Sequence, residues 1–135
     1  MIPVYLKILK LFLFLLSVYN NVPKSRTFIN FAESYLLMQR IFAKSTLRDF
    51  WKKHPDSEQY LKTWYDIALN SDWRTPNDVK KTYSNASILK GGRIIFNIKG
   101  NDYRLVARFN YEKQWIFIRF IGTHNEYDKI NAETI

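Results

Sequence analysis

Residues 94–121, IIFNIKGNDYRLVARFNYEKQWIFIRFI, decide the fold that we expect for this chain. Side chains alternate with period two in three runs, Ile94–Lys99, Tyr103–Phe109 and Trp115–Ile121, which is typical of β-strands. Short turns at 100–101 and 112–113 separate the runs. We therefore predict an antiparallel meander of three strands, or of four if Ala86–Leu89 adds a short strand before it.

The predicted turns also set a register for the sheet. The opposed residues are then Asn97 and Arg104, Arg104 and Ile121, Ile95 and Val106, and Val106 and Arg119. Opposed residues share a face, so one face is almost purely apolar and includes Phe120. The other face holds cations with apolar residues between them: Arg93, Asn97, Lys99, Arg104, Arg108 and Arg119, with Ile95, Val106, Trp115, Phe117 and Ile121.

Helical patterns precede the strands. Lys44–Lys53 has helical spacing, and His54-Pro55 ends it. Asp56, with Gln59 three residues later, fits a capping box for a second helix that ends near Ser71. A short third helix starts at Pro76. Helices followed by a meander predict an α+β fold: two to three N-terminal helices on one face of a three- to four-stranded antiparallel sheet, with a short C-terminal helix.

The composition narrows the function classes. Lys and Arg number 21 against 12 Asp and Glu, a formal charge of +9, which indicates nucleic acid, acidic membrane or an acidic protein as partner. The absence of cysteine excludes disulfides, thiolate catalysis and Cys-based zinc sites. Two histidines, His54 and His124, are too few for a His-rich metal site.

Residues 1–37 differ from the rest of the chain. Lys7 and Lys10 precede an uncharged run, Leu11–Pro23, of 13 residues, which is short for a spanning helix of about 20 residues. Three interpretations follow: a weak membrane anchor formed by residues 4–19, an additional helix packed on the domain, or an over-extended start upstream of Met38.

The cluster THNEYD, residues 123–128, follows the third predicted strand at once. Thr123 and Glu126 fit a capping box for a helix that begins at His124. On that helix His124 and Tyr127 share a face, and Asp128 is four residues from His124. A histidine exchanges protons near neutral pH, and a tyrosine donates a hydrogen bond or stacks on a base.

The cationic face has two interpretations. It is either a solvated surface, in which long side chains cover apolar stems, or a seat for phosphates and unstacked bases. With His124 beside it, the second interpretation supplies the parts for metal-free RNA cleavage. A base removes the proton of a ribose 2′-OH, the oxygen attacks phosphorus, an acid protonates the leaving oxygen, and arginines stabilise the phosphoryl charge.

Three segments together resemble the HigB-type toxins of bacterial type II toxin–antitoxin systems, in the RelE/ParE superfamily. They are RIFAKSTLRDFWKKHPDSEQYLKTWYD (40–66), SNASILKGGRIIFNIKGNDYRLVARFNYEKQ (84–114) and IRFIGTHNEYDKINAETI (118–135). Within them FNIKGN, YRLV and IGTHNEYDKI are specific in combination. The likeness covers residues 40–135, and family members begin near Met38. We therefore prefer the over-extended start, with an extension at 1–37 and a toxin domain at 38–135.

The resemblance implies a cytoplasmic mRNA interferase that cuts messages, typically on the translating ribosome, without a metal or other cofactor. It also implies a HigA-like helix-turn-helix antitoxin as partner, through which alone the toxin would contact operator DNA. The motif match is direct for Lys99, Arg104, Arg119, His124 and Tyr127.

The hypothesis for the site has His124 as acid/base group, Tyr127 orienting or stacking on the substrate, and Arg104 and Arg119 on the scissile phosphate. The residues expected to bind flanking RNA are Lys99, Arg108, Asn97, Phe117 and Trp115. The alternatives are a ParE-like inhibitor of gyrase, or a non-catalytic basic protein that binds RNA or associates with a membrane.

Overall fold

The chain divides into two compact units, Met1–Met38 and Gln39–Ile135. The computed structural model describes residues 4–19 and 39–135. The first unit contains one described helix, α1 (Val4–Tyr19). None of the helices in the described ranges is long and apolar enough to cross a membrane. The part of the expected extension at 1–3 and 20–37 lies outside the described residues, so our preference for a start at Met38 stays a prediction.

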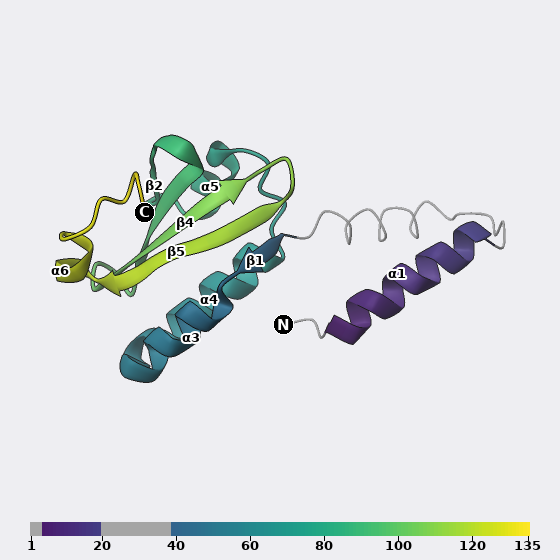
Figure 1. Cartoon of the computed structure of the whole chain (residues 1–135), viewed down its shortest axis with the longest axis horizontal. Helices are drawn as coiled ribbons and strands as arrows, with labels where there is room; N and C mark the ends of the chain where they lie inside the picture. Colours follow the sequence, from purple (N-terminus) through teal and green to yellow (C-terminus); the bar gives the residue numbers. More distant parts are fainter. Residues whose placement is uncertain (1–3, 20–38) are drawn as a thin grey trace. The chain divides into compact units, whose positions relative to one another are not determined.

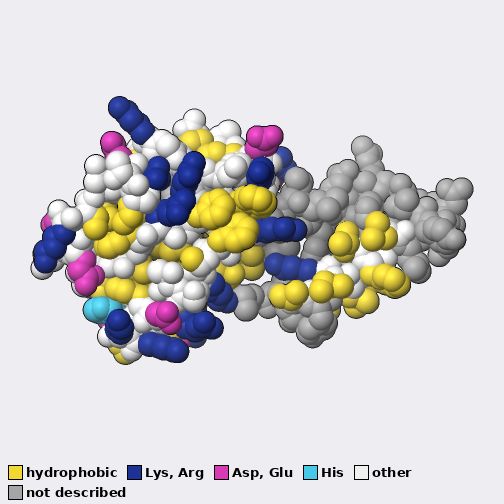
Figure 2. Space-filling view, in the orientation of Figure 1, with side chains coloured by type: hydrophobic (Ala, Val, Ile, Leu, Met, Phe, Trp, Pro, Cys, Tyr) yellow, Lys and Arg dark blue, Asp and Glu magenta, His cyan; other side chains and the backbone are white. Residues whose placement is uncertain are grey.

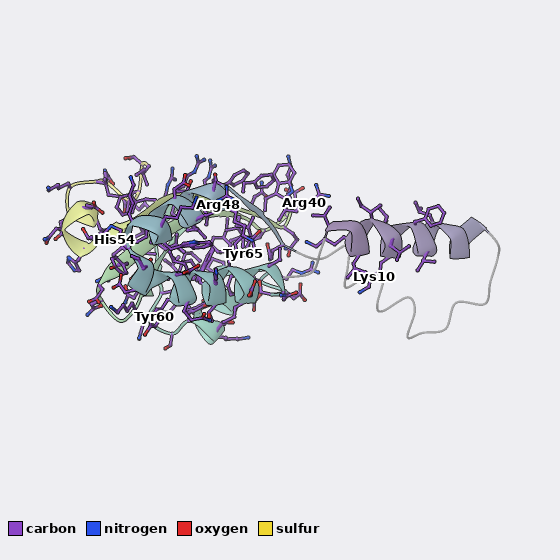
Figure 3. The ribbon with its side chains drawn as sticks, turned by 90° about the horizontal axis from the view of Figure 1, so that it is seen from below. Lys10, Arg40, Arg48, His54, Tyr60 and Tyr65 are labelled. Atoms are coloured by element: carbon purple, nitrogen blue, oxygen red, sulfur yellow. The ribbon has the colours of Figure 1, made fainter. Side chains whose placement is uncertain are left out.

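In the second unit one short strand precedes the helices and four strands follow them in the chain, which confirms the α+β class (Figure 1). Its elements in chain order are β1 (Arg40–Phe42), α3 (Lys44–Lys53), a 3-10 turn (Pro55–Ser57), α4 (Glu58–Leu69), α5 (Pro76–Thr82), β2 (Ser87–Ile88), a 3-10 turn (Lys90–Gly92), β3 (Arg93–Ile98), β4 (Tyr103–Asn110), β5 (Trp115–Thr123) and α6 (His124–Tyr127). Seen from below, α3 and α4 lie across one face of the sheet (Figure 3).

The sheet has five strands in the order β1-β5-β4-β3-β2 and is mixed. The prediction of three or four antiparallel strands was wrong at one edge. There β1 runs parallel to β5, with Arg40 opposite Trp115 and Phe42 opposite Phe117. Three residues are too few to show a period of two, so the sequence pattern could not reveal this strand. The expected short strand at 86–89 is β2, reduced to two residues.

A β-bulge changes the predicted register between β4 and β5. The β3–β4 register is as predicted, with Asn97 opposite Arg104. In β5, however, Arg104 faces Gly122 rather than Ile121, and Val106 faces Phe120 rather than Arg119. Ala107 still pairs with Ile118, so Arg119 is the extra residue of the bulge.

The bulge moves Phe120 to the opposite face from the one predicted. Phe120 packs with Ile95 and Val106, and the C-terminal residues Ala132 and Ile135 cover this second cluster. The main core lies on the other face, against the helices, and its most buried members include Leu47, Leu61, Trp64, Phe96, Leu105 and Ile116. The sheet is therefore buried on both faces at its centre.

Side-chain caps fix two of the helix starts. Thr75 and Asp78 form the capping box of α5, and Thr123 and Glu126 form that of α6, as predicted for the latter. The capping role predicted for Asp56 was wrong. Pro55 starts a 3-10 turn in which Ser57 donates to the His54 carbonyl oxygen, from Oγ at 2.7 Å and from its backbone N–H at 2.9 Å. The helix α4 therefore begins later, and the Asp56 carboxylate is left to other partners.

Candidate functional site

The sheet face that points away from α3 and α4 carries most of the predicted site residues. Arg108 and Arg119 are exposed there, and Arg104 is half-buried. Among the described residues, the side chains of Arg108 and Arg119 have no hydrogen-bond or ion-pair partner. Figure 2 shows basic side chains beside hydrophobic ones on one face of the molecule. A face with unpaired guanidinium groups can bind phosphates.

A cluster of three aromatic side chains lies at the β1–β5 edge of this face. Phe42 stacks on Phe117 with ring centroids 4.9 Å apart, and Trp115 meets Phe42 edge-on at 5.6 Å. The Lys113 Nζ lies 4.7 Å from the Trp115 ring centroid, and the Arg119 guanidinium lies 5.7 Å from that of Phe117. Aromatic rings flanked by cations can stack on unpaired bases. Sequence reasoning found Trp115 and Phe117 but missed Phe42, because its strand was not predicted.

His124 lies at the far end of β5, at the start of α6. Its Nδ1 atom is 3.2 Å from an Asp128 carboxylate oxygen, and both side chains are about half exposed. The carboxylate can hold the imidazole in one orientation, which leaves Nε2 for a substrate. This pair is the arrangement predicted from the spacing of residues 124 and 128.

The β3–β4 turn holds His124 and Arg104 at the same end of the sheet. The His124 backbone N–H donates to the Asp102 carbonyl oxygen at 3.2 Å. The Arg104 guanidinium donates to the carbonyl oxygen of Asn101, also at 3.2 Å. Gly122, two residues before His124, is the strand partner of Arg104. An imidazole and a guanidinium group are thus attached to one turn.

Tyr127 does not share the surroundings of His124, although the spacing suggested a common face. It is half-buried and packs against the cluster of Ile95, Val106 and Ala132. Its ring centroid is 6.4 Å from that of Phe120. The bulge brings Phe120 to this face, so that Tyr127 has an apolar neighbour that the predicted register did not provide.

Lys99, expected to bind RNA, is held by two carboxylates. Its Nζ lies 2.7 Å from Asp56 and 3.6 Å from Asp102. The Tyr103 hydroxyl donates to the same Asp56 carboxylate at 2.8 Å. Hydrogen bonds from Lys99, then Tyr103, hold the pKa of Asp56 below its usual value, and the bond to Asp56 raises the pKa of Lys99. This clamp joins the turn after α3 to the turn that carries His124 and Arg104.

His54, two residues before Asp56, packs against aromatic rings of the core side of the domain. The His54 ring stacks on Phe50 with centroids 4.4 Å apart and meets Tyr103 edge-on at 5.5 Å. Figure 3 shows His54 at the end of α3. Within the described ranges no group of three or more His, Asp or Glu side chains could hold a metal ion.

Replacing Asp56 by Asn should reduce the acid sensitivity of the fold. Because the folded pKa of Asp56 is lowered, its ion pair stabilises the domain above the unfolded value of 3.8, and this stability is lost as pH falls through the folded pKa. Asp56→Asn should therefore lower the urea midpoint at pH 7 more than at pH 3. Equilibrium unfolding at both pH values measures the difference. Asp49→Asn, at an exposed carboxylate of α3, is the control, and equal losses at both pH values would contradict the clamp.

The fold and the site define a small basic α+β domain with a histidine–carboxylate pair at the end of a cationic sheet. Residues 57–130 match the HigB toxin family, described as the RelE-like toxic component of a toxin–antitoxin system. That match spans more than half of the chain, and the chain belongs to this family.

Curated relatives agree with the family match. The chain is 27% identical over 94 residues to the mRNA interferase toxin HigB of Escherichia coli K12, covering 68% of this chain and 90% of that protein. It is 25% identical over 92 residues to the mRNA interferase HigB of Escherichia coli O6:H1, covering 67% and 89%. A protein of Shigella flexneri with the same name matches at 27% over 94 residues, again covering 68% and 90%.

Proposed function

We propose that this chain is the toxin of a type II toxin–antitoxin system and an endoribonuclease that cuts mRNA, acting on the translating ribosome. Family membership supports the toxin role, and the names of the relatives support mRNA as the substrate. The observation that carries the chemistry is the His124–Asp128 pair beside Arg104. These groups suit attack by a ribose 2′-OH on its own phosphodiester.

In the proposed reaction His124 acts as the principal acid/base group. It removes the proton from the 2′-OH, and the 2′ oxygen forms a bond to phosphorus while the bond to the 5′ oxygen breaks. The departing 5′ oxygen takes a proton from water, which leaves a 2′,3′-cyclic phosphate and a 5′-OH, and His124 then returns its proton to the solvent. Asp128 orients the imidazole through Nδ1. The chemistry requires no metal ion.

The arginines and aromatics of the face hold the message in this scheme. Arg104 and Arg119 bind the scissile phosphate and stabilise its charge in the transition state. Arg108 and Asn97 bind the flanking backbone, and Trp115 and Phe117 stack on bases. Two roles change with the structure. In this scheme Tyr127 supports α6 by packing on the cluster of Ile95, Val106 and Ala132 instead of contacting the substrate, and Lys99 acts mainly through its ion pair with Asp56.

The proposed partners are mRNA, the ribosome and a HigA-like antitoxin that neutralises the toxin. Since translating ribosomes carry the messages, the proposed site of action is the cytoplasm. The net charge of +9 favours both polyanionic RNA and an acidic surface on the antitoxin. Contact with operator DNA would then be made through the antitoxin alone.

Induced expression of the full chain should stop growth and create new mRNA 5′ ends within coding regions. Co-expression of the neighbouring antitoxin gene should prevent both effects. Mapping of mRNA ends before and after induction, together with a gyrase supercoiling assay, separates the two toxin classes. Intact messages with inhibited gyrase would contradict the proposal. Expression from Met38 should give the same cleavage if residues 1–37 are dispensable.

A further inference from the structure

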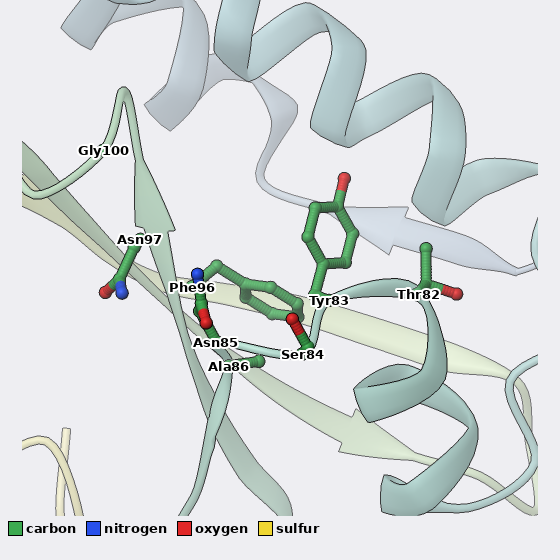
Figure 4. Close-up of a pocket in the computed structure, with 8 residues that line it drawn as sticks. All are labelled: Thr82, Tyr83, Ser84, Asn85, Ala86, Phe96, Asn97 and Gly100. Carbon is green, nitrogen blue, oxygen red and sulfur yellow. The ribbon is translucent and has the colours of Figure 1, made fainter.

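A hollow of about 260 Å³ lies beside β3, next to the loop that precedes β2. Its walls come from the end of α5, the loop before β2, and β3 with its turn (Figure 4). The half-buried Tyr83 ring gives it an apolar floor and packs on Phe96, which is only 1% exposed, with ring centroids 5.3 Å apart. Its polar lining residues include Ser84, Asn85 and Asn97.

The polar groups of this hollow are available to a ligand. Among the described residues, the side chains of Ser84, Asn85 and Asn97 have no hydrogen-bond partner. Asn85 and Asn97 are both exposed. An amide carries two donors and an acceptor, and a hydroxyl carries one donor with acceptor lone pairs. The hollow therefore offers both hydrogen-bond donors and hydrogen-bond acceptors.

The main chain of Asn97 adds a further donor and acceptor. The Leu89 N–H donates a hydrogen bond to the Arg93 carbonyl oxygen at 2.8 Å, and Ser87 of β2 pairs with Ile95 of β3. Along a strand of an antiparallel ladder, the main-chain N–H and C=O groups of successive residues point to alternate neighbours. Those of Asn97 therefore point to the same side of β3 as those of Arg93 and Ile95, toward β2. Since β2 begins at Ser87, no strand in the described ranges pairs with Asn97 there.

The loop that faces this edge is fixed in place. The Lys80 Nζ donates to the carbonyl oxygens of Ser84 and Ala86, at 2.6 and 2.8 Å. The Ala86 N–H bonds the Tyr83 carbonyl oxygen at 3.0 Å. On the other side Gly100 leaves open space where a Cβ would stand. A pre-formed site loses little conformational entropy on binding.

Across the strands of the sheet, the hollow is in register with the candidate catalytic groups. Asn97 is opposite Arg104, and Arg104 is opposite Gly122, which leads to His124. Adjacent strands are about 4.8 Å apart, so two strand spacings, roughly 10 Å, separate Asn97 from β5, the strand that ends directly before His124. A nucleotide next to the scissile phosphate can reach across such a distance.

We propose that this hollow is a subsite for one nucleobase of the message, adjacent to the bond that is cut. This inference rests on the proposed function. The main-chain N–H and C=O of Asn97 would pair with the edge of the base, Asn85 and Ser84 would bind its remaining polar atoms, and the Tyr83 ring would contact its face. The subsite would set a sequence preference that the cationic face cannot supply, because phosphate contacts do not distinguish bases.

The shape of the edge favours a base over an added peptide strand. β3 ends at Ile98, and Lys99 has a φ of 52°, so the chain turns away immediately. Among the described residues of β3, only Asn97 therefore leaves main-chain groups unpaired at the hollow. Strand addition needs several such residues in a row, whereas a base needs one donor and one acceptor.

Replacing Asn85 tests the subsite in the full chain. Messages cut by the wild type, Asn85→Ala, Asn85→Asp and Asn77→Ala are compared by mapping their ends. Asn85→Ala should weaken the preference for one base near the cut about tenfold, with a smaller change in total cleavage. Asn85→Asp should change which base is preferred, because a carboxylate accepts but does not donate. Asn77, exposed on α5 and outside the hollow, is the matched control and should leave the preference intact.

The possible outcomes separate the two proposals. If all four proteins cut with the same preference, the subsite is overturned while the proposed function stands. If none cuts any message, the proposed function fails and the subsite fails with it. If Asn85→Ala keeps the preference but weakens antitoxin binding, the hollow is a protein-docking site, and the nucleobase assignment is wrong.

Discussion

His124→Ala is expected to lower the rate of message cleavage at least about 100-fold, since general acid–base groups contribute that much or more. The imidazole is exposed and its only hydrogen-bond partner among the described residues is Asp128, so the fold should survive. The α6 cap depends on Thr123 and Glu126, which the substitution leaves in place. Primer extension on ribosome-bound messages, at matched protein concentration, measures the rate.

Two further variants show whether His124→Ala slows cleavage by removing an acid/base group or by disturbing the fold. His54→Ala removes a histidine that packs on Phe50 and Tyr103, so it should lower stability and leave cleavage near the wild-type rate below the unfolding temperature. Asp128→Asn keeps the side-chain shape but weakens the hold on Nδ1, and should slow cleavage less than His124→Ala does. Cleavage by His124→Ala at the wild-type rate would remove His124 from the mechanism.

Local sequence signals predicted the fold well where they acted over a few residues. The range of α3 and the capping box of α6 are as predicted, because helical spacing and cap chemistry are local. The β3–β4 register is also as predicted, since a short turn containing Gly100 fixes it. The bulge at Arg119 could not be predicted from the sequence, because period-two alternation continues through β5 and only the strand pairing reveals the extra residue.

The site was harder to predict because its residues are sorted by tertiary contacts. Lys99 and Arg104 look equivalent in the strand pattern, yet Lys99 pairs with Asp56, 43 residues earlier in the chain. Phe42 joins Trp115 and Phe117 only because β1 adds to the sheet in parallel. The location of His124 at the end of the sheet could be predicted, since it follows the last strand directly and the cap holds it there.

The largest stability effect is expected at Trp64, at the centre of α4. Its side chain is 1% exposed and packs edge-on against Phe96 on β3, with ring centroids 5.3 Å apart. It therefore joins the helix layer to the sheet. Its indole N–H is buried and has no hydrogen-bond partner among the described residues, so part of what the ring contributes is offset by desolvation of that group.

Trp64→Ala should lower the free energy of unfolding by about 3–5 kcal/mol, the range for emptying a large aromatic site in a core. Trp64→Phe should cost much less, because it keeps most of the packing and removes the unsatisfied N–H. Trp51→Ala, at a half-buried tryptophan of α3 whose ring lies 5.4 Å from the Lys62 Nζ, is the matched control and should cost at most about 2 kcal/mol. Urea unfolding at pH 7 compares the three. Equal losses for Trp64→Phe and Trp64→Ala would mean that the indole N–H has a partner that stabilises the fold, and that packing alone does not explain the role of Trp64.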